Sequence, residues 1–190
     1  MLFATALSFI KLLMTFPIVI SGGSMVPTFY NDDIVYAEMF DARFGEISRG
    51  DIVVFTLPYE SKANGVGGGV VADGEAKGFL EFGDLYIKRV VGVSGDEVAF
   101  KNGKIFVNGE ELKEPYIRKG TVTRGGEVAI VGNSGVELSP DGTGVVYKVP
   151  KNSYFLLGDN RESSVDSRNF TYPYVKRENI KGVFTYLKFP

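Results

Sequence analysis

The order of apolar and polar residues divides the chain into an apolar N-terminal segment and a longer part built from short strand-like runs. Residues 1–20 are apolar apart from Lys11 and a few Thr, Ser and Pro residues. Beyond them, short runs rich in branched and aromatic residues alternate with turn residues, and almost no helical period is visible. The runs lie at residues 33–37, 51–55, 85–93, 97–100, 104–107 and 154–157. This pattern predicts a mainly β fold.

The turn residues suggest how these strands are organised. Asn-Gly pairs at residues 102–103 and 108–109 predict two tight hairpins in the middle of the chain. We therefore expect residues 96–151 to form a smaller β lobe, inserted into a catalytic β core made of residues 21–95 and 152–190. The glycine-rich segment over residues 61–78 is typical of a surface loop.

The N-terminal segment has the length of a membrane anchor. A helix of residues 1–20 would be roughly 30 Å long, which matches the bilayer core. Lys11 lies at its middle, where a lysine costs about 2.5–3.5 kcal/mol on insertion scales. Three interpretations stay open, namely a span whose lysine snorkels, a cropped start, and an anchor lying in the interface. A buried structural helix is the alternative to all three.

The charges after this segment predict its orientation. Asp32, Asp33, Glu38 and Asp41 all precede Arg43, the first basic residue that follows. Basic loops stay in the cytoplasm, so this flank tolerates export. We expect a single-pass protein of the cell inner (plasma) membrane, with its catalytic domain on the periplasmic or extracellular side.

Composition removes several kinds of chemistry. The chain has 44% hydrophobic residues and a formal net charge of −2, which favours a folded protein without the basic surface that nucleic acid binding needs. It contains no His and no Cys, so a thiol nucleophile, an imidazole base and a zinc site of His and Cys are all excluded. We expect no metal and no cofactor. For a serine nucleophile, lysine is the remaining candidate base.

Three segments supply candidates for such chemistry. Ser24 follows two glycines and precedes Met-Val-Pro-Thr, where the backbone can approach a substrate closely. Lys88 lies in the apolar run Tyr-Ile-Lys-Arg-Val-Val, and burial that lowers a lysine pKa to roughly 7–8 makes it a general base. A polar segment, Gly-Asp-Asn-Arg over residues 158–161, continues to Ser164, Asp166 and Arg168. Each segment alone fits a purely structural turn or an edge strand.

Taken together, the segments resemble the bacterial type I signal peptidases, or leader peptidases, which are membrane-bound serine peptidases with a Ser/Lys dyad. The resemblance runs in the same order from about residue 11 to residue 183. It rests on four elements: Ser-Met-x-Pro-Thr, Arg-Gly-Asp-Ile-Val-Val-Phe over residues 49–55, Tyr-Ile-Lys-Arg-Val-x-Gly followed by Gly-Asp, and Gly-Asp-Asn-Arg followed by Ser-x-Asp-Ser-Arg.

The resemblance implies a role for each matching residue. Ser24 would be the nucleophile and Lys88 the base, while Ser164 would orient the lysine amine. Asp166 and Arg168 would brace the site. Shallow apolar pockets for small substrate side chains would be formed by Ile18, Ile20, Phe29, Val35, Val54, Tyr86 and Ile87.

The oxyanion hole departs from the family pattern. The Ser24 backbone amide would be one donor, but Gly22 stands where many bacterial members carry a serine whose hydroxyl completes the hole. Ser21, a backbone amide or water would have to replace that hydroxyl.

The sequence thus predicts a membrane-bound serine endopeptidase that cleaves signal peptides from exported preproteins after small residues, in the pattern Ala-x-Ala. Its partners would be preprotein signal peptides and the lipid bilayer. Two alternatives stay open. One is a specialised processing peptidase of the same superfamily, of the conjugation or mitochondrial inner-membrane type. The other is an inactive membrane-anchored β binding module.

Overall fold

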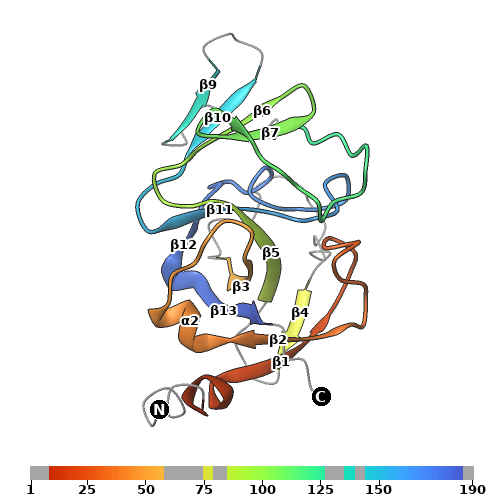
Figure 1. Ribbon diagram of the computed structural model, residues 1–190, viewed down its shortest axis with the longest axis vertical. Helices are drawn as coiled ribbons and strands as arrows, with labels where there is room; N and C mark the ends of the chain where they lie inside the picture. Colours follow the sequence, from red (N-terminus) through yellow and green to blue (C-terminus); the bar gives the residue numbers. More distant parts are fainter. Residues whose placement is uncertain (1–8, 58–74, 79–84, 127–134, 140–143, 186–190) are drawn as a thin grey trace.

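Two antiparallel sheets make up the computed structural model, which describes residues 9–57, 75–78, 85–126, 135–139 and 144–185 (Figure 1). The larger sheet has the strand order β12 (Val175–Lys176), β11 (Ser153–Leu157), β5 (Leu85–Gly92), β3 (Ile52–Thr56), β13 (Ile180–Thr185), β2 (Ile34–Glu38), β1 (Thr15–Ile20) and β4 (Glu75–Gly78). Because β4 also pairs with β5, the strands from β5 to β4 close into a ring. The mainly β fold that the sequence predicts is therefore confirmed.

The smaller sheet lies beyond β5 and β11, at the end of the molecule away from the N-terminus (Figure 1). Its order is β8 (Glu110–Glu111), β7 (Lys104–Val107), β6 (Glu97–Lys101), β10 (Val145–Lys148) and β9 (Val136–Leu138). Both predicted hairpins are present, since each Asn-Gly pair has the positive φ angles that such turns require. The strands fall within residues 96–151, the range expected for an inserted lobe.

The two sheets share one hydrophobic cluster. Val91, Phe155 and Leu157 of the larger sheet pack with residues of the smaller one, including Val98 and Tyr147. The Tyr147 and Phe155 rings lie 4.7 Å apart between centroids. The smaller sheet therefore buries its apolar face against β5 and β11. Its status as a separate domain stays a prediction.

Two short helices pack close to the larger sheet, α2 and η2. Helix α2 (Met39–Phe44) follows β2, and the 3₁₀ helix η2 (Arg177–Asn179) precedes β13. The Arg177 guanidinium donates hydrogen bonds to the Gly45 carbonyl at 2.5 Å and to the Ala42 carbonyl at 3.3 Å. A cation therefore satisfies carbonyls at the C-terminal end of α2, where the helix dipole favours positive charge.

The N-terminal segment differs from the anchor expected over residues 1–20. Residues 9–13 are helical, but Thr15–Ile20 is strand β1, paired with β2 and β4. Every second side chain of β1, at Phe16, Ile18 and Ile20, is buried, which is the period of a strand. The anchor prediction is wrong for these residues, because their alternate apolar side chains pack in the hydrophobic core. No helix in the described part of the chain is long and apolar enough to cross a membrane. Residues 1–8 lie outside the described ranges, as does most of the predicted loop at 61–78, of which 75–78 form β4.

A charged cluster ties the start of the described chain to α2. Lys11 Nζ donates to both carboxylate oxygens of Asp41, at 2.7 and 2.8 Å, and lies 3.7 Å from Glu38. Glu38 is only 6% exposed, and its Oε1 accepts no hydrogen bond from any described residue. Burial, together with the neighbouring Asp41, raises the pKa of Glu38 to about 7.

This raised pKa predicts a pH dependence of stability. Between the ordinary glutamate value of 4.5 and about 7, the folded state binds more protons than the unfolded chain. The Glu38 contribution to the free energy of unfolding must therefore fall as the pH rises through that window. Glu38→Gln removes the ionisable carboxyl and with it this loss of stability. As the pH is raised from about 5 to about 8, the variant should therefore become more stable relative to the original protein.

Urea unfolding at both pH values measures this difference. Glu178→Gln is the matched control, because the Glu178 side chain is 74% exposed. Parallel pH dependences in the original protein and in Glu38→Gln would contradict the prediction.

Candidate active site

The structure brings Ser24 and Lys88 together. Ser24 lies in the turn between β1 and β2, and Lys88 lies in β5. Lys88 Nζ is 2.7 Å from Ser24 Oγ and donates to the Ile87 carbonyl at 2.9 Å. Ser24 is 1% exposed and Lys88 is 0% exposed. Such burial disfavours the charged ammonium and so favours a lysine that can accept a proton.

The turn that carries Ser24 is closed at its base by backbone hydrogen bonds. Ile20 and the end of the turn exchange two bonds, from Ile20 N to Asp33 O at 2.8 Å and from Asp32 N to Ile20 O at 2.9 Å. Gly22 has a φ angle of 90°, in the left-handed region that favours glycine. The backbone thus gives a physical reason for glycine at this position.

The Gly-Asp-Asn segment after β11 holds the backbone of the nucleophile. The amide N–H of Asn160 donates to the Ser24 carbonyl, and its side-chain Nδ2 donates to the Gly23 carbonyl, both at 3.0 Å. A Cβ atom at Gly158 would lie 2.5 Å from the Ser24 carbonyl oxygen and 2.1 Å from Ser164 Oγ. Only glycine permits this close approach.

A buried ion pair joins the three sequence segments. Asp159 accepts two hydrogen bonds from Arg89, at 2.8 and 2.6 Å, and one from the Thr28 hydroxyl. The Asp159 side chain is 0% exposed and that of Arg89 is 10% exposed. Arg89 also donates to the Gly50 carbonyl at 2.7 Å. Thr28, from the segment that carries Ser24, and Arg89, next to Lys88, are therefore bonded to one carboxylate.

These partners were missed as functional residues by the sequence reasoning. Thr28, Arg89, Asp159 and Asn160 all lie inside the motifs that identified Ser24 and Lys88. The signal that could have found them is one cation inside an apolar run, at Arg89, and one carboxylate directly after another apolar run, at Asp159. Opposite charges of that kind need each other as partners.

The proposed bracing residues form a second ion pair beside the same turn. Arg168 donates to Asp166 at 2.8 and 2.9 Å, and both side chains are almost fully buried. Asp166 accepts the Gly158 amide N–H at 3.1 Å. The pair therefore lies where a brace for the Gly158 turn would be needed.

Ser164 does not make the contact with Lys88 that its expected role suggests. Its Oγ is buried and makes no hydrogen bond with any described residue, so the expected bond to the Lys88 amine is not formed here. The hydroxyl nevertheless packs beside Gly158, which also contacts the Ser24 carbonyl.

Of the two residues expected at the oxyanion hole, one has its backbone amide engaged. The Gly22 N–H donates to the Asn31 side chain at 2.8 Å. The Ser24 N–H makes no hydrogen bond within the described ranges. It therefore remains an available backbone donor.

Most of the apolar residues expected to form the substrate pockets lie in one cluster. That cluster also contains Met25, the neighbour of the nucleophile. Tyr86 is the exception, because it packs in another cluster against Phe55, with ring centroids 5.8 Å apart. The expected residues that share the Met25 cluster are Ile18, Ile20, Phe29, Val35, Val54 and Ile87.

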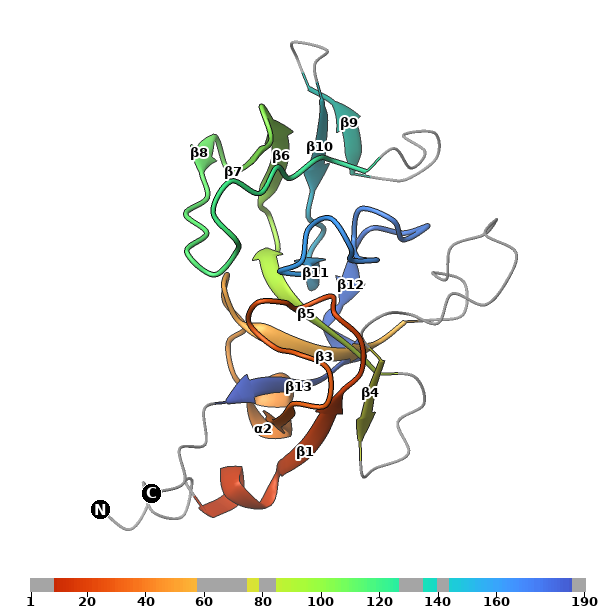
Figure 2. The same cartoon turned by 90° about the vertical axis from the view of Figure 1, so that its right-hand side faces the viewer.

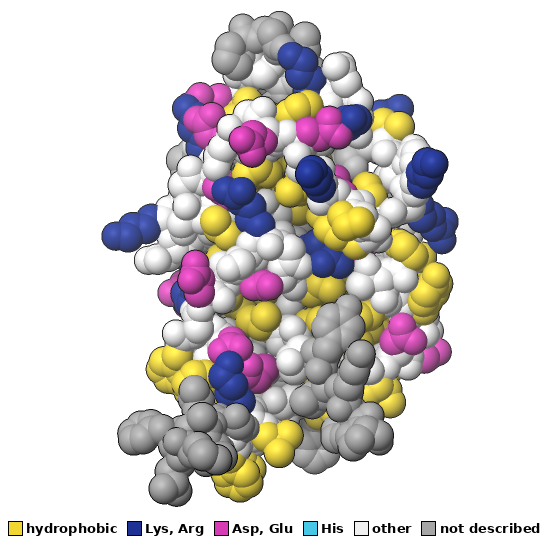
Figure 3. Space-filling view, viewed as in Figure 1, with side chains coloured by type: hydrophobic (Ala, Val, Ile, Leu, Met, Phe, Trp, Pro, Cys, Tyr) yellow, Lys and Arg dark blue, Asp and Glu magenta, His cyan; other side chains and the backbone are white. Residues whose placement is uncertain are grey.

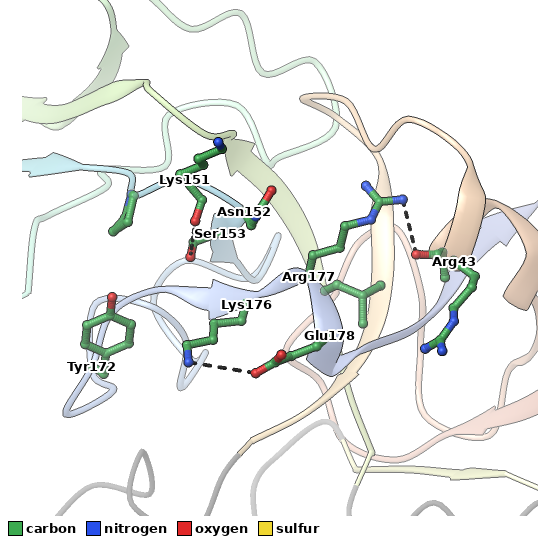
Figure 4. Close-up of a pocket in the computed structure, with 11 residues that line it drawn as sticks. Arg43, Lys151, Asn152, Ser153, Tyr172, Lys176, Arg177 and Glu178 are labelled. Carbon is green, nitrogen blue, oxygen red and sulfur yellow. Dashed lines mark hydrogen bonds and ion pairs between the residues drawn. The ribbon is translucent and has the colours of Figure 1, made fainter.

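A surface cavity of about 590 Å³ lies elsewhere, and Figure 4 shows its lining side chains. It contains none of the predicted site residues. Arg177, which lines it, is bonded to carbonyls of α2, and Lys176 lies 3.8 Å from Glu178. No group of Asp and Glu in the described part of the chain is arranged to hold a metal ion.

Comparison with known proteins shows the family to which the chain belongs. The family model described as "Signal peptidase, peptidase S26" matches residues 1–187. Signal peptidase I S of Bacillus subtilis is 33% identical over 175 residues, which is 92% of this chain and 77% of that protein. Signal peptidase IB of Staphylococcus aureus is 34% identical over 154 residues, covering 81% and 68%. The chain therefore belongs to the signal peptidase family, peptidase S26.

One solved structure is also similar. It is a signal peptidase I from Enterococcus faecalis, with 23% sequence identity and a TM-score of 0.44, over 74% of this chain and 97% of that one. This score is too low for the likeness to bear on function.

The Arg89 and Asp159 pair yields a prediction of stability. Asp159→Ala leaves the buried guanidinium without its carboxylate, and breaking a buried pair in this way costs about 3–5 kcal/mol. Glu137→Ala is the control, because the Glu137 and Lys148 pair is exposed and screened by solvent, so its loss should change stability little. Urea unfolding of both variants measures the difference. Equal losses of stability would contradict a dominant role for the buried pair.

Proposed function

We propose that this protein is a membrane-bound serine endopeptidase that cleaves N-terminal signal peptides from exported preproteins after small residues. The single observation that carries the proposal is the buried contact of 2.7 Å between Ser24 Oγ and Lys88 Nζ. Membership of the peptidase S26 family supports it, as do relatives named signal peptidase I. In a chain without His or Cys, this pair supplies the nucleophile and the base.

Acylation follows from the geometry of the pair. The neutral amine of Lys88 accepts the Ser24 hydroxyl proton as Oγ bonds to the carbonyl carbon of the scissile peptide. The resulting ammonium donates that proton to the leaving amine as the carbon–nitrogen bond breaks. The acyl group is left as an ester of Ser24. The Lys88 amine has acted as imidazole does in other serine peptidases.

Deacylation reuses the same two groups. Lys88 takes a proton from the attacking water, and Ser24 Oγ leaves the ester carbon and recovers a proton from the ammonium. In both tetrahedral intermediates, negative charge develops on the former carbonyl oxygen. We assign the Ser24 amide N–H as one donor to that oxygen.

The remaining site residues support this pair. Ser164 Oγ, buried beside Gly158 and without a hydrogen-bond partner among the described residues, would turn to the Lys88 amine when the substrate is bound. Asp166 and Arg168 would hold the turn in place through the Gly158 amide.

The preference for Ala-x-Ala follows from the apolar cluster beside the nucleophile. Ile18, Ile20 and Ile87 are each at most 2% exposed and already closely packed. Because these side chains already pack against one another, a pocket formed beside them would be shallow and would fit small substrate side chains. Tyr86 packs on another cluster, so the proposed pocket is made by its neighbours.

A location at the membrane fits the exposed side chains. Phe9, Leu12, Leu13 and Phe44 are each more than half exposed. They belong to the N-terminal helical segment and to α2, and hydrophobic side chains are visible at this end in Figure 3. Single-pass anchoring in the inner (plasma) membrane, with the catalytic domain on the periplasmic or extracellular side, remains part of the proposal.

The dyad makes the first prediction of activity. Ser24→Ala and Lys88→Ala should each remove nearly all cleavage of a preprotein in detergent, and the double variant should be no worse than either, because the residues act as a unit. Ser163→Ala is the matched control. Ser163 is an exposed serine next to Ser164 in the sequence, so this variant should keep full activity. Folding of each variant is checked by circular dichroism. Activity within tenfold of the original protein in either single variant would contradict the assignment.

The need for a neutral lysine makes the second. Because Lys88 must lose its proton before it can accept that of Ser24, kcat/KM for an Ala-x-Ala peptide should rise from about pH 6 through the alkaline side of neutrality. Ser164→Ala should lower kcat/KM and shift this profile while leaving the protein folded, because the amine loses an orienting hydroxyl. A flat profile, or one that falls between about pH 6 and pH 8, would exclude a neutral lysine as the base.

A further inference from the structure

The segment that follows β8 leaves the smaller sheet and descends toward β5 of the larger one (Figure 2). It contains Glu114 and Tyr116, which no motif singled out. Both side chains contact arginines that lie next to the active-site turn. The segment thus connects the smaller sheet directly to the surroundings of Ser24.

Tyr116 covers the arginine of the buried ion pair. The Arg89 guanidinium carbon lies 3.9 Å from the centroid of the Tyr116 ring, the geometry of a cation–π contact. The nitrogens of the same guanidinium donate hydrogen bonds to Asp159 and to the Gly50 carbonyl. The ring therefore covers one face of a guanidinium whose edges are already hydrogen-bonded.

Glu114 pairs with a second arginine from the same turn. The two terminal guanidinium nitrogens of Arg161 donate to the Glu114 carboxylate, Nη1 at 3.1 Å. The Arg161 side chain is 0% exposed and that of Glu114 is 8% exposed. Arg161 Nε also donates to the Gly158 carbonyl at 2.9 Å. The Tyr116 hydroxyl donates to Glu114 at 3.0 Å, which joins the two contacts.

We propose that Glu114 and Tyr116 are positioning residues that clamp the active site from the smaller sheet. They hold Arg161 and Arg89, and these two arginines hold Gly158 and Asp159. The next residue, Asn160, fixes the carbonyls of Gly23 and Ser24. The proposal rests on the proposed function of the Ser24 and Lys88 pair.

The expected effect is on turnover, because the clamp acts on the position of Ser24 and not on the apolar cluster proposed to bind substrate. A displacement of a reacting group by about 1 Å can lower the rate about a hundredfold. Weakening the clamp should therefore lower kcat and leave KM nearly unchanged.

Four variants separate positioning from general destabilisation. Tyr116→Leu removes the ring face, whereas Tyr116→Phe keeps it and loses only the hydroxyl. Glu114→Gln removes the charge that neutralises Arg161. Glu111→Gln is the matched control, because the same change is made in the same sheet at an exposed pair with Lys104. Kcat and KM are measured with an Ala-x-Ala peptide, and kcat is divided by the fraction of protein that is folded at the assay temperature, from circular dichroism.

Tyr116→Leu and Glu114→Gln should lower kcat by about tenfold or more with KM within about threefold, while Tyr116→Phe and Glu111→Gln keep kcat within about threefold. Unchanged kcat in Tyr116→Leu, or an equal loss in Tyr116→Phe, overturns the assignment of Tyr116. If Glu114→Gln does not fold, the comparison of the two Tyr116 variants decides, because both leave Glu114 in place. Failure of the proposed function is a different result, since the original protein itself would then show no cleavage that depends on Ser24.

Discussion

The buried ion pair between Arg89 and Asp159 is the interaction on which the rest of the site depends. Removing two charges from water is costly, and the attraction between them offsets that cost only when the hydrogen bonds are well formed. Here Asp159 accepts from Arg89 and from Thr28, so its partners come from both of the segments that carry Ser24 and Lys88. One carboxylate thus fixes the relative positions of three segments that are distant in the sequence.

The proposed role of Lys88 as the base depends on the same packing. A lysine in water is an ammonium at neutral pH and cannot accept a proton. Lys88 lies in a strand whose residues are all buried, and its Nζ donates to Ser24 Oγ and to the Ile87 carbonyl, two neutral groups that can also face a neutral amine. The charge of the adjacent Arg89, in contrast, is paired with the Asp159 carboxylate. Consecutive residues of one strand are therefore given opposite electrostatic surroundings.

The strands and the two candidate catalytic residues could be predicted because their signals are local. Strands β2, β3, β5, β6, β7 and β11 begin and end within one or two residues of the runs seen in the sequence. Strand β1 was missed because its outward positions, such as Val19, are also apolar, which hides the period of two and imitates a membrane segment. Strand β4 was missed because it lies in a glycine-rich segment with no strand pattern of its own.

Contacts between distant segments could not be predicted. The Asn160 bonds to the Ser24 turn, the Tyr86 packing against Phe55 and the Tyr116 stacking on Arg89 all depend on how the sheets are arranged. No local pattern carries that information. Ser164 shows the same limit, since its motif predicts a hydroxyl near the lysine but not which partner it contacts.

The central claim is that burial makes Lys88 a neutral amine near the pH at which the enzyme works. NMR of protein labelled with ¹³C at the lysine ε carbons tests it most directly, with the Lys88 signal identified by its loss in Lys88→Met. The account predicts that this signal titrates with a pKa well below the ordinary lysine value of about 10.4. Titration of Lys88 at or above that ordinary value would contradict the account.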